Sequence, residues 1–111
     1  MQLEFCIESE KLIVCLSGEL DHHSSEEVRI KIDDRLDRNT ITKLILDFSG
    51  VTFMDSSGIG VVIGRYRRLE AKKGAICLIN VTEPIKRIFE MSGIFKIIKL
   101  YESLEQAIKL L

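Results

Sequence analysis

The feature that most constrains the fold is a buried-strand pattern that leads through a short polar turn into an amphipathic helix. Residues 44–48 (LILDF) form an almost unbroken apolar run of strand length, as expected for a strand covered on both faces. Residues 53–60 (FMDSSGIG) follow, and both Asp55 and Ser56 are residue types preferred at a helix N-cap. The sequence therefore predicts a helix that follows Ser56 and runs to about Ala71, with apolar residues at helical spacing: Ile59, Val62, Ile63, Tyr66 and Leu69.

The start of this helix has two interpretations. The first N–H groups of a helix have no partner inside it and are commonly satisfied by a capping side chain, so Asp-Ser-Ser-Gly is also the composition of an ordinary capped loop. The same free donors, together with the positive partial charge of the helix start, would stabilise a phosphate on a serine hydroxyl. Local composition alone favours the capped loop.

Three glycines, Gly58, Gly60 and Gly64, lie within the predicted helix. Each costs about 1 kcal/mol relative to alanine in a helix interior. Gly60 and Gly64 are one turn apart on one face, and close packing against a strand or a partner protein would account for them. Internal packing accounts less well for Gly58, which lies beside the serines and leaves their hydroxyl groups unshielded.

The N-terminal third predicts a hairpin, a loop and a helix. Polar and apolar residues alternate through residues 2–8 and 11–16 on either side of a short polar turn, which indicates an antiparallel hairpin. Residues 18–23 are too polar and too short for a regular element, so we expect a loop. Ser24 and Glu27 form a capping box at the start of a helix to about Asp37, whose charged face we assign to solvated surface: Glu26, Arg29, Lys31, Asp33 and Asp34.

The second half continues the alternation of strands and helices. We expect a strand at residues 75–79, a helix from about Thr82 that ends at Gly93, and a short strand at residues 96–100. A second capping box, Ser103 with Gln106, opens a C-terminal helix. The predicted fold class is α/β: a mixed sheet with an N-terminal antiparallel hairpin followed by βαβ units, and helices mainly on one face.

Length and composition indicate one cytoplasmic domain over residues 1–111. The net charge of -1 gives no basic surface for nucleic acid. No run approaches the ~18 apolar residues of a membrane span, and the N-terminus lacks a signal-peptide pattern. Cys6, Cys15 and Cys77 lie in apolar strand-like runs without paired spacing, so we expect buried, reduced thiols in a reducing compartment.

No motif for catalysis, metal or cofactor is present. His22 and His23 are the only histidines, and no cysteine or carboxylate cluster with ligand spacing surrounds them, so a role as hydrogen-bonding loop residues or partner contacts is favoured. The glycine motifs of P-loop, dinucleotide-binding and α/β-hydrolase sites are absent. A phospho-receiver domain with Asp47 as acceptor would begin with a βαβ unit, not a hairpin. We expect a non-enzymatic protein without metal or cofactor.

Three segments carry a resemblance to a known family. Residues 18–23 (GELDHH), residues 53–60 (FMDSSGIG) with 64–66 (GRY), and residues 91–98 (MSGIFKII) resemble the bacterial anti-sigma factor antagonists, which are single STAS domains. The first and third segments resemble the sporulation branch in particular. Only Ile59 and Ile94 differ from the family pattern, each a conservative replacement for leucine.

The resemblance implies a function in a partner switch. In this family the first serine of the motif, here Ser56, is phosphorylated by an anti-sigma factor that is itself an ATP-dependent serine kinase, and a serine phosphatase reverses the modification. The unphosphorylated antagonist binds the kinase and releases sigma factor F in the sporulation branch. The resemblance implies a monomer when free and a docking surface beside Ser56, made of Glu19, Leu20, Asp21, His22, Asp55, Ser57, Gly58 and Ile59. The alternatives are a general-stress antagonist with the same mechanism and a STAS module that senses an anion or nucleotide.

Overall fold

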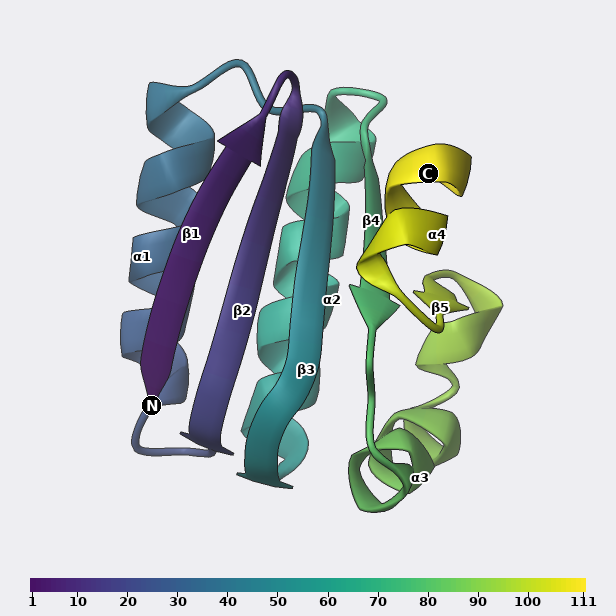
Figure 1. Ribbon diagram of the computed structural model, residues 1–111. Coiled ribbons are helices and arrows are strands. Elements are labelled where there is room, and N and C mark those ends of the chain that lie inside the picture. The colour runs from purple at the N-terminus through teal and green to yellow at the C-terminus, as the bar shows by residue number, and fades with distance from the viewer.

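The computed structural model describes all residues, 1–111, and shows a five-stranded sheet with four α-helices (Figure 1). The strands lie side by side in sequence order, β1 to β5. β1 and β2 pair antiparallel, and every later pair of neighbouring strands is parallel. The elements in chain order are β1 (Gln2–Glu8), β2 (Lys11–Leu20), α1 (Ser25–Arg38), β3 (Lys43–Met54), α2 (Ser56–Ala71), β4 (Ala75–Ile79), α3 (Glu83–Ser92), a 3-10 helix η1 (Ile94–Lys96), β5 (Lys99–Tyr101) and α4 (Leu104–Leu110).

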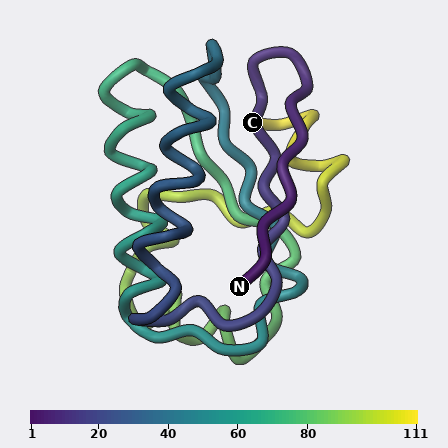
Figure 2. Tube along the Cα trace, turned by 90° about the vertical axis from the view of Figure 1, so that its left-hand side faces the viewer, coloured from purple at the N-terminus to yellow at the C-terminus, as the bar shows by residue number.

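Helices α1, α2 and α3 cover one face of the sheet, and the short α4 covers part of the other. The two sides are visible in Figure 2, where α1 and α2 lie on one side of the strands and the C-terminal segment on the opposite side. The larger core joins residues of β2, β3 and β4 to residues of α1, α2 and α3. A smaller core of five residues lies under α4: Ile13, Ile45, Cys77, Ile79 and Ala107. The predicted fold class is confirmed.

Two strands extend further than the sequence indicates. Residues 18–20, expected in a loop, continue β2, where Glu19 pairs with Phe53 and Leu20 with Met54. The register shifts between Cys15 and Ser17 and again between Gly18 and Glu19. These irregularities break the period-two alternation that makes a strand visible in a sequence. The longer strands carry the start of α1 and the start of α2 to the same edge of the sheet.

The two capping boxes have different outcomes. Ser103 caps α4, because its hydroxyl oxygen accepts a hydrogen bond from the Gln106 N–H at 3.1 Å. Ser24 does not cap α1, because its hydroxyl donates to the Glu19 carbonyl at 2.7 Å and accepts from the Asp21 N–H at 3.1 Å. The predicted capping box at Ser24 is therefore wrong. The Ser24 hydroxyl instead bridges the backbone of Glu19 and Asp21, before the helix.

The segment after α3 differs in part from the expectation. The strand predicted at residues 96–100 is shorter and later, at Lys99–Tyr101, because η1 takes up residues 94–96. Gly93 ends α3 in a left-handed conformation with φ of 78°, as predicted.

Of the three cysteines, only Cys77 is buried, and Cys6 and Cys15 are exposed on the hairpin. The expectation that all three thiols are buried is wrong, because apolar neighbours in a hairpin do not show which face a residue occupies.

Candidate functional site

The candidate site lies where β2 and β3 end. Because these strands are parallel and Leu20 pairs with Met54, the loop that follows β2 and the helix that follows β3 start next to each other. The loop, residues 21–24, has four residues, whereas Asp55 alone separates β3 from α2. In Figure 1 both connections lie at the lower end of the sheet.

Asp55 joins the loop to the helix. One carboxylate oxygen, Oδ1, accepts from the Ser57 N–H at 2.8 Å, which makes Asp55, and not the other candidate Ser56, the N-cap of α2. The other, Oδ2, accepts from the His22 N–H at 3.1 Å. Hydrogen bonds from the Ser57 backbone and then from the His22 backbone lower the pKa of Asp55, because they favour its charged form. The carboxylate is therefore both a helix cap and a link between two segments.

The two serines occupy different environments. Ser56 is the first residue of α2, and its exposed side chain makes no hydrogen bond within the protein. Ser57 is half-buried, and it lines a shallow depression between α1 and α2 with Ser25, Glu26, Arg29, Gly60 and Val61. A hydroxyl that is free, exposed and at a helix start can accept a phosphoryl group without disturbing the core. Ser56 meets these conditions for a phosphate acceptor better than Ser57 does.

Asp21 organises the loop. Its Oδ1 accepts from the His23 N–H at 2.9 Å and from the Ser24 N–H at 3.1 Å. His22 and His23 are both exposed, with ring centroids 5.6 Å apart in an edge-to-face arrangement. Loss of the Asp21 carboxylate would therefore disturb the loop itself as well as any contact made by its exposed side chains.

Two of the predicted docking residues cannot contact a partner directly. Leu20 is 0% exposed and belongs to the larger core, and Gly58 is also buried. A Cβ at Gly58 would lie 2.5 Å from Met54 Cγ, so this glycine permits close packing of α2 on β3. The other predicted docking residues reach the surface: Glu19, Asp21, His22, Asp55, Ser57 and Ile59 are exposed or half-buried.

The sequence suggested that internal packing explains Gly60 and Gly64 better than Gly58, and the structure shows the opposite. A Cβ at Gly60 or Gly64 would meet no atom within 4 Å outside the helix itself. Internal packing therefore explains Gly58 and does not explain the other two. The remaining part of the expectation, close approach of a partner protein, stays a prediction for Gly60 and Gly64.

Phe53 is an exposed residue beside the site that the sequence did not single out as a contact. Its side chain is 51% exposed. It pairs with Glu19 at the ends of β3 and β2, three residues before Ser56. Apolar residues at a strand end usually suggest burial, so sequence alone could not show that this ring faces solvent.

The described residues contain no cluster of three or more histidine, cysteine, aspartate or glutamate side chains arranged to hold a metal ion. None of the helices combines the length and the apolar character that a membrane span needs.

The comparisons with known proteins place this chain and its fold in one family. The STAS domain model matches residues 4–107. The chain is 44% identical over 92 residues to the anti-sigma F factor antagonist of Paenibacillus polymyxa, an alignment that covers 83% of this chain and 79% of that protein. The chain therefore belongs to the STAS-domain anti-sigma factor antagonists, a class of regulators rather than enzymes.

Two solved structures of similar sequence cover nearly the whole chain. The anti-sigma factor antagonist SpoIIAA in its unphosphorylated form aligns with a TM-score of 0.74 at 37% identity, over 97% of this chain and 94% of that one. The Bacillus cell fate determinant SpoIIAA in the phosphorylated form aligns with the same TM-score at 38% identity, over 97% and 96%. A similar protein is thus known in both phosphorylation states.

Proposed function

We propose that this chain is an anti-sigma F factor antagonist that is controlled by phosphorylation of Ser56. The unphosphorylated form binds an anti-sigma factor that is also a serine kinase and so releases sigma factor F, and a serine phosphatase restores that form after phosphorylation. The observation that carries the proposal is the exposed, unbonded hydroxyl of Ser56 at the first position of α2, beside a loop held by Asp55. The identity to an anti-sigma F factor antagonist supports the choice of partner.

Phosphorylation would act through charge at the surface. A phosphoserine carries about -1.5 to -2 charges at neutral pH, and here it would stand next to the carboxylate of Asp55. The Ser57 and Gly58 N–H groups already bond to Asp55, so the positive partial charge of the helix start is what stabilises the phosphate in the isolated domain, and the fold persists. A partner surface that fits the neutral hydroxyl would then face a bulky anion, and binding is lost. SpoIIAA, which resembles this chain, has been solved in both phosphorylation states.

The proposed docking surface is the exposed edge around Ser56. It consists of Glu19, Asp21, His22, Asp55, Ser57, Ile59 and, added from the structure, Phe53. An exposed aromatic ring at the centre of an interface is a common source of binding energy. The domain acts in the cytoplasm as a monomer when free, and it binds a protein rather than nucleic acid.

The proposal is tested by binding to the purified anti-sigma F factor of the same organism, measured by titration calorimetry with ADP present. Wild type and Ser56→Ala are expected to bind equally, and Ser56→Glu about a hundredfold more weakly, in line with the loss of a central contact. Phe53→Ala is expected to weaken binding about tenfold. Ile30→Ala is the matched control, because Ile30 is 53% exposed on α1. If wild type binds an anti-sigma B factor and not the anti-sigma F factor, the partner named here is wrong.

A further inference from the structure

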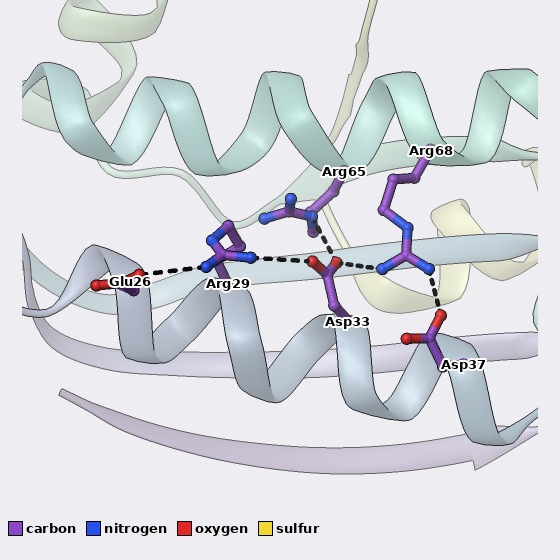
Figure 3. Close-up of polar contacts among 6 residues, drawn as sticks. All are labelled: Glu26, Arg29, Asp33, Asp37, Arg65 and Arg68. Atoms are coloured by element: carbon purple, nitrogen blue, oxygen red, sulfur yellow. Dashed lines mark hydrogen bonds and ion pairs between the residues drawn. The ribbon is translucent and has the colours of Figure 1, made fainter.

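An ion network joins the C-terminal half of α1 to the C-terminal half of α2, away from Ser56 (Figure 3). The Asp33 carboxylate lies between two arginines of α2, with Oδ1 2.9 Å from Arg65 Nε and 2.8 Å from Arg68 Nη1. Arg68 also pairs with Asp37 on the next turn of α1. The other oxygen of Asp33 lies 3.8 Å from Arg29 Nη1. Asp33, which the sequence pattern assigned to solvated surface, is thus the centre of the helix–helix contact.

The network is poorly suited to stabilise the fold. Arg65 is 5% exposed, yet its Nη1 has no hydrogen-bond partner. Its Nε is close enough to Asp33 for an ion pair, but the geometry is not that of a hydrogen bond. Burial lowers the pKa of Arg65, and the attraction of Asp33 acts against this effect. Buried ion pairs with incomplete hydrogen bonding contribute little net stability, because desolvation offsets the attraction.

Apolar packing alone leaves the axial position of α1 open. The buried residues of α1 are Val28, Ile32 and Leu36, spaced four residues apart. A shift of α1 by four residues, about 6 Å along its axis, would therefore place two of the three at sites that are apolar already. The first turns of α1 and α2 do not fix this position by close packing. A depression separates them, and a Cβ at Gly60 would meet no atom within 4 Å. A specific polar contact resolves such a degeneracy.

The position of α1 determines the shape of the loop at the candidate site. Strand pairing fixes Leu20 against Met54, but four loop residues then connect β2 to α1. The Ser24 and Ser25 N–H groups donate to the Asp21 carbonyl at 3.2 and 2.9 Å. A displacement of α1 would therefore pass to the loop and to the His22 N–H that reaches Asp55 Oδ2. The Ser57 N–H, by contrast, bonds to Asp55 Oδ1 within a single connection and does not depend on α1.

We propose that Asp33, paired with Arg65 and Arg68, is a positioning group that sets the axial position of α1 against α2 and thereby holds the loop of residues 21–24 against the start of α2. The effect on partner binding rests on the proposed function. The effect on the loop does not, because it is a property of the free domain.

The test replaces the ion pair by apolar side chains of similar volume, in Asp33→Leu/Arg65→Met. Such replacements commonly leave stability unchanged or raise it, so the urea midpoint should not fall. If the network positions the loop, exchange of the His22 amide with water, measured by NMR, should accelerate about tenfold, as expected for local opening, while exchange of the Ser57 amide stays constant. Affinity for the anti-sigma F factor should fall by a similar factor.

The control is Asp34→Ala/Arg38→Ala, which removes an ion pair of 2.9 Å within α1 that does not reach α2. This control should change the exchange rate of neither the His22 amide nor the Ser57 amide. If the apolar variant does not fold, Asp33→Asn provides the same measurement, with the same acceleration at His22 expected. Unchanged exchange at His22 in a folded variant overturns the positioning role. Accelerated exchange together with unchanged affinity would confine the role to the free domain and contradict its link to docking. If wild type itself does not bind, the proposed function fails, and the exchange rates still decide the positioning role.

Discussion

Replacing Gly58 by alanine tests the packing beneath the start of α2. The added Cβ would lie 2.5 Å from Met54 Cγ, 2.7 Å from Met54 Sδ and 3.1 Å from Leu20 Cδ2. Met54 is 2% exposed and Leu20 is 0% exposed, so both side chains are enclosed in the core that would have to adjust. Overpacking of this kind costs about 1–3 kcal/mol. The gain in helix propensity from glycine to alanine returns at most about 1 kcal/mol.

Gly58→Ala should therefore lower the free energy of unfolding by up to about 2 kcal/mol, the cost of overpacking less the gain in helix propensity. Gly60→Ala is the matched control, because the same methyl group would meet nothing within 4 Å. That variant should be more stable than wild type by about 0.5–1 kcal/mol. Urea unfolding followed by circular dichroism measures both, and the two midpoints should differ by roughly 1–2 M for a domain of this size.

The comparison of the two variants decides the outcome, since they share the same chemical change. If Gly58→Ala unfolds at the same urea concentration as Gly60→Ala, or at a higher one, then the Met54 side chain rearranges around the new methyl group without loss of stability. The explanation of Gly58 as a packing residue would then be wrong.

Two further predictions concern the thiols and the response to acid. Cys6 and Cys15 are exposed and should react with iodoacetamide in the folded protein, whereas burial raises the pKa of Cys77 to about 12, so it should be labelled only on unfolding, as mass spectrometry can show. Asp55 has a pKa below its ordinary value of 3.8, chiefly through the Ser57 N–H, so its contribution to stability is present above that value and is lost as the pH falls through the lower, folded-state pKa. Asp55→Asn should accordingly show a shallower loss of stability in acid than wild type, measured as the urea midpoint against pH.

Elements with regular local patterns were predicted well from the sequence. The hairpin, the buried strand and the helix that begins at Ser56 each have a periodicity that reflects their own burial. Asp55 was one of two cap candidates, with Ser56, because a cap and its helix are neighbours in the chain, and the structure selects Asp55. Such features need only local information, so one sequence is sufficient to predict them.

The errors arise where a distant partner decides the conformation. Residues 18–20 extend β2 because β3 offers backbone partners more than thirty residues away. Ser24 has the pattern of a cap, but its hydroxyl donates a hydrogen bond to the Glu19 carbonyl instead. Asp33 lies on a charged helix face, yet Arg65 approaches it from another helix. Leu20 stands in a polar segment, and the strand continuation turns its side chain into the core. None of these partners is visible in the periodicity of a single segment.

The central claim is that Ser56 carries the regulatory phosphate. Wild type, Ser56→Ala and Ser57→Ala are incubated with the anti-sigma F factor of the same organism and ATP, and the tryptic peptide of residues 44–65 is sequenced by mass spectrometry. The account predicts phosphate on Ser56 in wild type and in Ser57→Ala, and an unmodified peptide from Ser56→Ala. Phosphate on Ser57 with Ser56 unmodified, or phosphate retained in Ser56→Ala, would contradict it.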